Sequence, residues 1–255
     1  MNDPWEYPGE LYEIIRAYYR DLQAETDFLK SYGLKRGDYL LDIGCGTGTL
    51  IRKLSLDGIN CTGIDISRSF IRYARSRLPS SESGVSIPKL SVEPAQNLLK
   101  KITLSQRYDV ILIVFNVLSY LESFQQVESL VKKLRTTLKD GGRLVLEFAM
   151  YLNFVPRFAS NMTVNHWDDG LVINRAITHH IDPYNAMWTH EEIMSVISGR
   201  TTKIYPQRYE QLIITPIWIE RILRTCSYSK IEAFTNWHKG NRLSDESTCI
   251  FVCTV

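Results

Sequence analysis

The sequence has no apolar run that could cross a membrane. Its most apolar stretch, residues 110–118, is broken by Asn116 and is far shorter than the about 20 residues that a membrane helix needs. Acidic residues recur through the first thirty positions, where a signal peptide would need an apolar segment. We therefore expect a cytoplasmic protein with no membrane partner.

The sequence also lacks a large excess of charge of one sign and lacks cysteines spaced as metal ligands. The formal net charge is only +2, and Lys and Arg are spread along the chain, so no nucleic-acid partner is expected. The five cysteines include no CxxC pair, and we interpret them as reduced thiols. Because no other metal-ligand spacing is found in the sequence, no metal site is predicted.

What the sequence does contain, between residues 38 and 149, is an alternation of apolar strands and amphipathic helices. Predicted strands cover residues 39–43, 61–65, 89–92, 108–115 and 143–148, and predicted helices cover 49–56, 67–78 and 122–138. Such alternation is typical of a parallel sheet built from βαβ units. An earlier segment, residues 10–31, has the apolar spacing of one helix.

After residue 150 the pattern becomes that of hairpins. Residues 162–181, 185–197 and 200–214 are rich in β-branched and aromatic residues, and turn-forming groups separate them. They predict three or four antiparallel strands, followed by a helix over 216–226 and closing strands over 230–237 and 249–255.

These patterns predict an α/β protein. The expected fold is a Rossmann-like, doubly wound, mostly parallel seven-stranded sheet with an N-terminal helical lid and an inserted antiparallel β layer. The lid is assigned to residues 1–34, the sheet domain to 35–150 and 215–255, and the insertion to 151–214. We expect the insertion to contribute substrate contacts and, through a sheet edge, a possible homodimer contact.

A glycine-rich loop, Asp42-Ile43-Gly44-Cys45-Gly46-Thr47-Gly48, joins the first predicted strand to a helix. Glycine lets the backbone turn tightly and approach a ligand, and the helix start presents free N–H groups. Asp65 ends the second strand, where a carboxylate can accept hydrogen bonds from a ribose diol. A dinucleotide fingerprint would need a third glycine where Thr49 stands, which disfavours a nicotinamide-dependent oxidoreductase.

The loop, Asp65 and the segment 138–142 together resemble the motifs of class I S-adenosylmethionine-dependent methyltransferases. In that family the match for Asp42 lies near the methionine amino end of the cofactor, and the match for Asp65 binds the ribose hydroxyls. The resemblance implies S-adenosylmethionine as cofactor and S-adenosylhomocysteine as its product. It implies cofactor-binding roles for Tyr7, Tyr19, Asp42, Gly44, Cys45, Gly46, Gly48, Asp65, Ile66, Glu93, Pro94, Ala95 and Phe115.

Within that family the chain is most similar to small-molecule N-methyltransferases, especially amino-sugar N,N-dimethyltransferases, and more loosely to glycine N-methyltransferase. The N-terminal tyrosines, the segment 114–121 and the insertion before the last helix carry this similarity. Two residues depart from the pattern. Pro94 stands where the family has an aspartate that contacts the adenine amine, and Tyr120 where it often has a histidine thought to act as base.

The predicted reaction is methyl transfer to a small-molecule acceptor, at nitrogen more readily than at oxygen. An alkylammonium must first lose a proton, so a base, a water or a desolvated pocket is needed. Catalytic candidates are Tyr120, Tyr19 and Asn116, and acceptor-binding candidates are Tyr12, Glu147, His179, Arg208 and Tyr209. His179 and His180 are adjacent in a predicted strand, so at most one can face a pocket.

Three alternatives remain open at this point. One is an O-methyltransferase of a small metabolite. The second is a nucleic-acid methyltransferase, although the typical (Asn/Asp)-Pro-Pro-(Tyr/Phe) motif is replaced by Asn116-Val117-Leu118-Ser119. The third is a non-catalytic module that only binds S-adenosylmethionine.

Overall fold

A computed structural model describes residues 7–79, 85–95, 97, 107–150, 161–238 and 248–255. The main sheet has seven strands in the order β10-β11-β5-β4-β1-β2-β3, and only β11 runs antiparallel to its neighbours. This confirms the predicted Rossmann-like sheet. Its strands are β1 (Tyr39–Ile43), β2 (Asn60–Asp65), β3 (Lys89–Val92), β4 (Tyr108–Ile113), β5 (Leu138–Ala149), β10 (Lys230–Phe234) and β11 (Thr248–Thr254).

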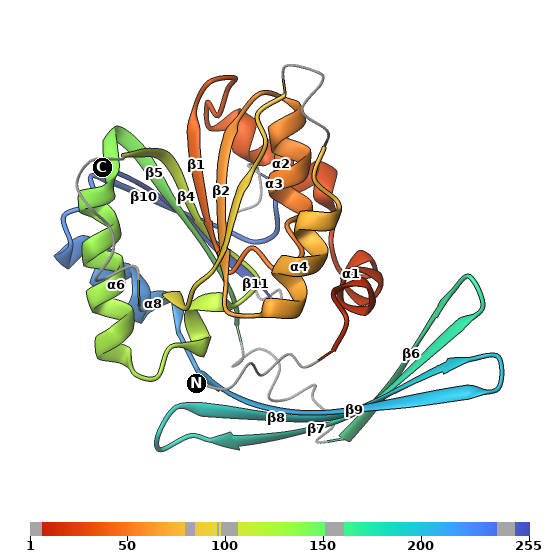
Figure 1. Cartoon of the computed structure of the whole chain (residues 1–255). Coiled ribbons are helices and arrows are strands. Elements are labelled where there is room, and N and C mark those ends of the chain that lie inside the picture. The colour runs from red at the N-terminus through yellow and green to blue at the C-terminus, as the bar shows by residue number, and fades with distance from the viewer. Residues whose placement is uncertain (1–6, 80–84, 96, 98–106, 151–160, 239–247) are drawn as a thin grey trace.

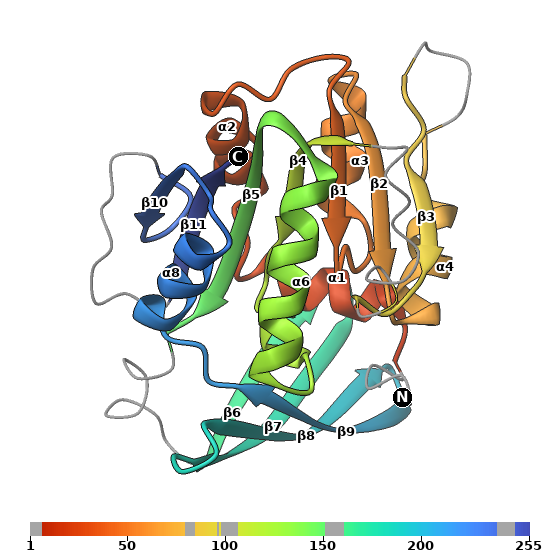
Figure 2. The same ribbon diagram turned by 90° about the vertical axis from the view of Figure 1, so that its left-hand side faces the viewer.

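Helices cover both faces of this sheet (Figures 1 and 2). One face is covered by α6 (Phe124–Thr137) and α8 (Pro216–Thr225), and the other by α2 (Leu22–Ser31), α3 (Thr49–Leu56) and α4 (Arg68–Ser76). Alternate residues of each strand feed two separate cores: Ile111 and Leu144 pack toward α6, whereas Leu112 and Val145 pack toward α2 and α3. None of the helices within the described ranges is long and apolar enough to span a membrane.

Residues 10–31 are helical as expected except for a break at residues 18–21. The structure has α1 (Gly9–Ala17) and α2, separated by a turn. Asp21 begins the second helix because its side chain accepts a hydrogen bond from the Ala24 backbone N–H at 2.9 Å. The break turns α1 away from the main sheet, toward the site described below.

The expected start of β5 is wrong. Residues 140–142 were predicted to separate a helix from a strand beginning at residue 143, yet β5 begins at Leu138. Its pairing with β4 shifts register between Tyr108 and Val110, and Gly141 has a φ of +72°. Gly141 and Gly142 therefore lie within β5, where they form an irregularity in its pairing with β4.

The predicted antiparallel layer is a separate four-stranded sheet, β6-β7-β8-β9. Its strands are β6 (Asn161–Asp168), β7 (Leu171–Asp182), β8 (Met187–Ser198) and β9 (Thr201–Leu212). This small sheet lies across the end of the main sheet at which the parallel strands finish, as Figure 2 shows. The site therefore has a floor made of strand ends and a cover made of the insertion.

Helix α1 joins the two sheets. Leu11 and Ile15 of α1 pack in one apolar cluster with Phe70 of α4 and with Ile173 and Met194 of the small sheet. After α1, the Tyr18 hydroxyl donates to the Trp167 carbonyl oxygen at 2.7 Å. The N-terminal helix is thus fixed between the insertion and the main sheet.

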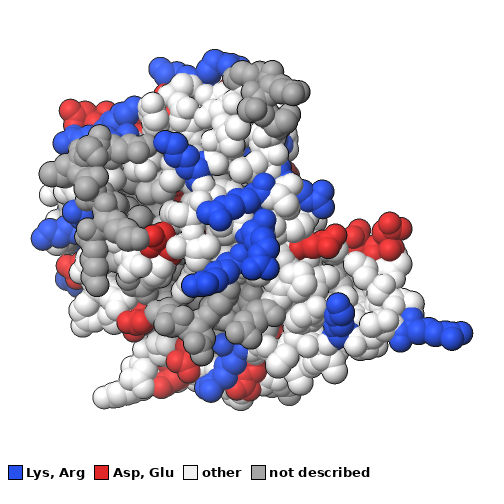
Figure 3. Space-filling model, viewed as in Figure 1, with Lys and Arg blue, Asp and Glu red and all other residues white. Residues whose placement is uncertain are grey.

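Charged side chains of both signs are interspersed on the face in Figure 3. Several Lys and Arg side chains cross the centre of that face, where α4 lies in Figure 1. Arg68, Arg72 and Arg75 of α4 are exposed. They form a solvated surface of the helix, away from its buried residues Phe70, Ile71 and Ala74.

Candidate functional site

The glycine loop lies between β1 and α3. Gly44 and Gly46 have φ values of +80° and +56°, in the region that favours glycine. The Gly44 and Cys45 backbone N–H groups donate to the Ile64 carbonyl oxygen at 2.8 and 3.0 Å, which holds the loop against β2. A Cβ on Gly44 would lie 2.3 Å from Cγ2 of Val117, so the loop backbone passes its neighbours as closely as glycine permits.

Asp65 fixes the other side of the loop. Its Oδ2 accepts from the Gly46 N–H and its Oδ1 from the Ser67 N–H, both at 2.8 Å. The residue is 8% exposed and lines a cavity. The Asp65 carboxylate therefore lies between the glycine loop and the cavity.

Seven of the predicted cofactor residues share one cavity of about 250 Å³, here called the glycine-loop cavity: Gly44, Asp65, Ile66, Glu93, Pro94, Ala95 and Phe115. Four residues predicted for catalysis or acceptor binding also line it: Tyr12, Tyr120, Arg208 and Tyr209. Its volume is slightly below the about 300–1,000 Å³ of most small-molecule sites, and its mixed apolar and polar lining is that of such a site.

The remaining predicted cofactor residues lie outside this lining. Gly46 and Gly48 shape the loop, and the Cys45 thiol is buried beneath it. Tyr7 is buried, with its ring edge-on to Phe70 at 5.6 Å. Tyr19 is 56% exposed and lines a second cavity instead.

Asp42 is 2% exposed and lies at the end of β1, under the loop. Its Oδ1 is buried and has no hydrogen-bond partner within the described residues. Burial raises the pKa of this carboxyl to about 7, against the opposing effect of the Arg20 guanidinium. A buried acceptor atom without a donor indicates a place for a ligand donor.

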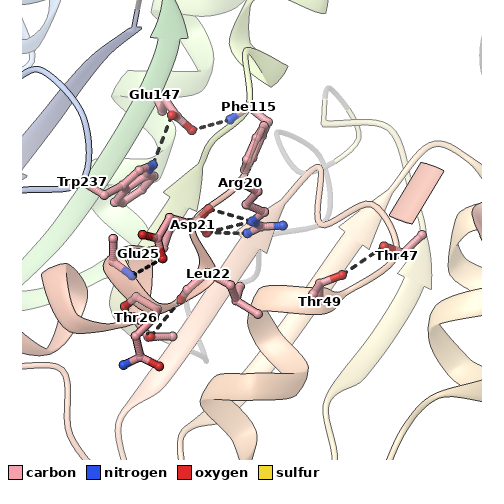
Figure 4. Close-up of polar contacts among 12 residues, drawn as sticks. Arg20, Asp21, Leu22, Glu25, Thr26, Thr47, Thr49, Phe115, Glu147 and Trp237 are labelled. Atoms are coloured by element: carbon pink, nitrogen blue, oxygen red, sulfur yellow. Dashed lines mark hydrogen bonds and ion pairs between the residues drawn. The ribbon is translucent and has the colours of Figure 1, made fainter. Parts of the chain in front are cut away.

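Arg20 and Glu25 form an ion pair that was not predicted from the sequence (Figure 4), and the charges of both act on Asp42. Nε and Nη2 of Arg20 donate to the carboxylate of Glu25 at 2.7 and 2.6 Å. The Arg20 guanidinium also lies 4.6 Å from the ring centre of Phe115. The pair binds the start of α2 to the wall between the two cavities.

The second cavity, of about 480 Å³, lies between β5, α2 and the small sheet and is here called the insertion cavity. It is lined by six of the residues predicted for catalysis or acceptor binding: Tyr19, Asn116, Tyr120, Glu147, His179 and Tyr209. Four residues line both cavities: Arg16, Phe115, Tyr120 and Tyr209. The two cavities are therefore neighbours separated by these side chains.

Glu147 is 6% exposed at the inner end of the insertion cavity. Its Oε2 accepts from the Phe115 N–H at 3.0 Å and its Oε1 from Nε1 of Trp237 at 3.2 Å (Figure 4). Burial raises the pKa of this carboxyl to about 7. The group can thus exist in either protonation state near neutral pH.

Asn116 has a mainly local role in the described contacts. Its Oδ1 accepts from the Ser119 hydroxyl at 3.0 Å and from the Ala149 N–H at 3.1 Å. Phe115 and Asn116 both have positive φ, at 57° and 64°, which turns the chain sharply after β4. Asn116 therefore stabilises the turn that places Phe115 and the 3-10 helix η2 (Val117–Tyr120) over the strand ends.

Side chains of the small sheet alternate as the sequence predicts. His179 lines the insertion cavity, whereas His180 is exposed on the opposite face and lies 3.8 Å from Glu191. The strand register aligns His179 with His190 and Tyr209 across β7, β8 and β9. The Tyr209 ring stacks on His190 at 4.3 Å and lies 5.4 Å from the Tyr120 ring.

The sequence interpretation missed several residues of this site. Arg16 is four residues after Tyr12, and that spacing on α1 could have indicated a shared face. The position of His190 in the site depends on the register between β7 and β8. The position of Trp237 depends on a contact between parts of the chain that are distant in sequence. No short-range pattern reveals such pairings.

The described residues fit an adenosine-type ligand that carries an ammonium group. Asp65 presents a carboxylate at the loop, Gly44 allows close backbone approach, and Asp42 has an unpaired buried oxygen. Among the parts of the chain that the structure describes, no three His, Cys, Asp or Glu side chains are grouped to hold a metal ion.

Parts of the sequence are similar to known methyltransferases. A family model described as a methyltransferase domain matches residues 41–144. A putative methyltransferase of Geobacillus sp. is 25% identical over 146 residues, which cover 53% of this chain and 56% of the relative. A demethylmenaquinone methyltransferase of Tropheryma whipplei is 28% identical over 152 residues, which cover 57% and 56%. The chain thus spans little more than half the length of these curated relatives.

Solved structures match nearly the whole chain. An S-adenosylmethionine-dependent methyltransferase from Clostridium acetobutylicum has a TM-score of 0.79 at 17% identity, with 96% of each chain covered. A sugar N-methyltransferase from Streptoalloteichus sp. has a TM-score of 0.74 at 15% identity, with 100% of this chain and 95% of that chain covered. Residues 41–144 are thus similar to a methyltransferase domain, and the whole chain has the fold of these solved structures.

Proposed function

We propose that the protein transfers the methyl group of S-adenosylmethionine to an amine nitrogen of a small molecule. One observation carries the proposal: a cavity at the glycine loop adjoins a second cavity under the insertion, and Arg16, Phe115, Tyr120 and Tyr209 line both. A methyl donor in the first cavity and an acceptor in the second would meet at this wall. Alignment of the two reactants is a large part of catalysis of such a displacement.

The glycine-loop cavity would hold the cofactor, which supplies an electrophilic methyl group when bound. Asp65 would bind ribose hydroxyls, and Asp42 would accept from an ammonium group. Phe115 and Tyr12 would contribute apolar surface. Three observations support these roles: Asp65, Phe115 and Tyr12 line the cavity, both carboxyl groups are buried, and Oδ1 of Asp42 has no hydrogen-bond partner within the described residues.

The insertion cavity would hold the acceptor. Its walls include the rings of Phe115, Tyr120, Trp188, Tyr209 and Trp237, with the buried carboxyl of Glu147. Aromatic faces attract cations, and a carboxyl can accept a hydrogen bond from an ammonium group. This lining favours an amine over a neutral alcohol. It is also consistent with the printed description of one similar structure as a sugar N-methyltransferase.

Two measurements test the proposal. Isothermal titration with S-adenosylmethionine and with NADH should show micromolar binding of the first and none of the second. Methyl transfer should then be assayed with D-glucosamine, 6-amino-6-deoxy-D-glucose and glycine. The N-acetyl derivative of each is the matched control, because it keeps every oxygen and removes the basic nitrogen.

We expect at least one amine to be methylated and its N-acetyl derivative to be inert. Equal methylation of both would assign the transfer to oxygen and contradict the proposed acceptor atom. Binding of NADH in place of S-adenosylmethionine, or no transfer to any amine of the panel, would contradict the proposed function.

A further inference from the structure

A histidine in the insertion cavity has no role in the function proposed above. His190 lies on β8, near the middle of the small sheet, and is 6% exposed. Its ring stacks on Tyr209, one of the four residues at the wall between the cavities. The imidazole is therefore one ring away from the place where donor and acceptor would meet.

Glu192 fixes one nitrogen of this imidazole. Nε2 of His190 lies 2.9 Å from Oε2 of Glu192. The same carboxylate accepts from Nε and Nη2 of Arg175 at 2.7 and 2.8 Å. Arg175 and His190 lower the pKa of Glu192 to about 2, so the carboxylate is ionised and accepts the hydrogen bond. The proton of neutral His190 is then on Nε2.

The other nitrogen, Nδ1, then carries a lone pair, and no hydrogen bond to it is found within the described residues. The neighbouring His179 differs in this respect. Its Nδ1 already accepts from Nε1 of Trp188 at 2.9 Å, and burial lowers its pKa to about 4. Of these two imidazoles, His190 is the one whose accepting nitrogen is available to a ligand.

From this arrangement we infer that His190 is the base that removes a proton from the ammonium group of the methyl acceptor, with Glu192 and Arg175 as positioning residues. The inference rests on the proposed function. A carboxylate that orients an imidazole, whose second nitrogen takes the proton, is a general-base arrangement found on many folds.

The step balances as follows. Nδ1 takes one proton from the ammonium nitrogen and leaves a free amine. The amine lone pair forms the N–C bond, while the C–S bond of the methyl donor breaks and its electron pair stays on sulfur, so the sulfonium becomes a thioether. The product is a methylated ammonium ion, and His190 returns its proton to water.

Charged groups of both signs surround His190. The ionisable groups that surround it or share the cavity are Arg175 and His179 on β7, Glu192 on β8, Tyr209 on β9, Arg16 on α1, Tyr19 and Asp21 between α1 and α2, Glu25 on α2, Tyr120 on η2 and Glu147 on β5.

The test is the pH dependence of kcat/KM for His190→Gln, measured with the panel amine that the wild type methylates. His180→Gln is the control, because it removes the neighbouring exposed histidine from the outer face of the same sheet. We expect His190→Gln to lower kcat/KM by about 10²- to 10⁴-fold at neutral pH, the usual contribution of a general base. The Kd of S-adenosylmethionine should stay unchanged, and His180→Gln should match the wild type.

Alkaline rescue separates a base from a merely structural residue. The variant can use only free amine from solution, whose fraction rises about tenfold per pH unit below the pKa of the amine. The ratio of wild-type to variant kcat/KM should fall by the same factor. A ratio independent of pH would overturn the inference while leaving the proposed function intact. So would alkaline rescue of Glu147→Gln but not of His190→Gln, which would make Glu147 the base.

A second measurement needs no acceptor. Long-range ¹H–¹⁵N NMR spectra distinguish protonated from unprotonated imidazole nitrogens, and His190→Gln assigns the signals. We expect Nε2 protonated and Nδ1 unprotonated in the neutral ring, with a change in Glu192→Gln. A proton on Nδ1 would leave no lone pair for the acceptor and would overturn the inference.

Discussion

Gly44 and Val117 meet where the glycine loop passes η2, and a Cβ on Gly44 would lie 2.3 Å from Cγ2 of Val117. Gly44→Ala should therefore displace the loop or η2, both of which line the glycine-loop cavity. We expect the Kd of S-adenosylmethionine, measured by titration calorimetry, to rise at least tenfold. The double variant Gly44→Ala/Val117→Ala should recover part of the loss, because it removes the clashing methyl groups.

Gly141→Ala is the matched control for that experiment. Gly141 also has a left-handed φ, at +72°, but nothing lies within 4 Å of its Cβ position. The Gly141→Ala protein should be about 1 kcal/mol less stable, because a non-glycine residue is disfavoured at a left-handed φ. Its affinity for the cofactor should stay unchanged. If Gly44→Ala bound S-adenosylmethionine as tightly as Gly141→Ala, the loop would not belong to the cofactor site.

The buried carboxyl of Asp42 should make the unliganded protein less stable as pH rises. Its pKa is about 7 in the folded protein and about 3.9 in an unfolded chain, so the folded state holds the extra proton between these values. Stability from this group is present below pH 4 and is lost as pH rises through 7, by up to about 4 kcal/mol. Urea unfolding at pH 5 and pH 8 should show a smaller loss for Asp42→Asn than for the wild type.

Asp140→Asn serves as the control for charge, because Asp140 is fully exposed. Glu147, whose pKa is also raised to about 7, adds a slope of the same sign, so some pH dependence should remain in Asp42→Asn. An Asp42→Asn protein that lost as much stability from pH 5 to pH 8 as the wild type would show that Asp42 is ionised throughout this range.

Glu192 should have the opposite pH dependence. Its folded-state pKa of about 2 lies below the unfolded value, so its stabilisation is complete above about pH 5 and disappears as pH falls toward 2. Glu192→Gln would leave Arg175 buried without its carboxylate, at a cost of about 3–5 kcal/mol near neutral pH. Thermal unfolding at pH 7 and pH 3 should show this cost shrinking in acid.

Glu191→Gln provides the comparison on the same strand. Glu191 points to the outer face, where its pair with Arg208 is 47% and 65% exposed, and exposed pairs contribute at most about 1 kcal/mol. Equal destabilisation by the two variants would mean that the Arg175–Glu192 pair is no more important than a surface pair.

Pro94 lines the glycine-loop cavity. The resemblance described in the sequence analysis predicts that an aspartate at this position would contact the adenine amine. Pro94→Asp should restore that acceptor and strengthen binding of S-adenosylhomocysteine by about tenfold, as a hydrogen bond with one charged partner does. The Pro94 carbonyl oxygen accepts from the Asn97 N–H at 2.9 Å, a turn that aspartate tolerates well. S-inosylhomocysteine, which has an oxygen in place of the amine, should gain nothing. An equal gain for both ligands would place Pro94 away from the amine.

Much of the fold could be predicted from the sequence because its strands are short, apolar and separated by amphipathic helices. Residues 40–43 and 110–113 are buried on both faces, and continuous apolar runs indicate such strands directly. The break between α1 and α2 was not foreseen, because apolar spacing continues through Tyr18 and Leu22 while Asp21 changes only the local capping. The start of β5 was predicted wrongly because the glycines of residues 140–142, which usually end an element, here form an irregularity within the strand.

Some parts of the candidate site could likewise be predicted from the sequence, and others could not. The glycine loop and Asp65 are contiguous with strand ends, so local pattern places them together. Arg20, Glu25 and His190 meet their partners through tertiary packing and strand register, neither of which local pattern contains. The contributions of His190 and Trp237 to the insertion cavity therefore became visible only with the structure.

The attachment of α1 to the small sheet has a consequence for the order of folding. Leu11 and Ile15 have one apolar partner, Phe70, on α4, and the others, Ile173 and Met194, on β7 and β8, more than 150 residues later in the chain. During synthesis from the N-terminus, these side chains stay partly exposed until the small sheet has emerged from the ribosome. Contacts so distant in sequence also form slowly, since a long loop must close first. Helix α1 and the small sheet, which cover both cavities, should thus be the last part of the nascent protein to become resistant to proteases.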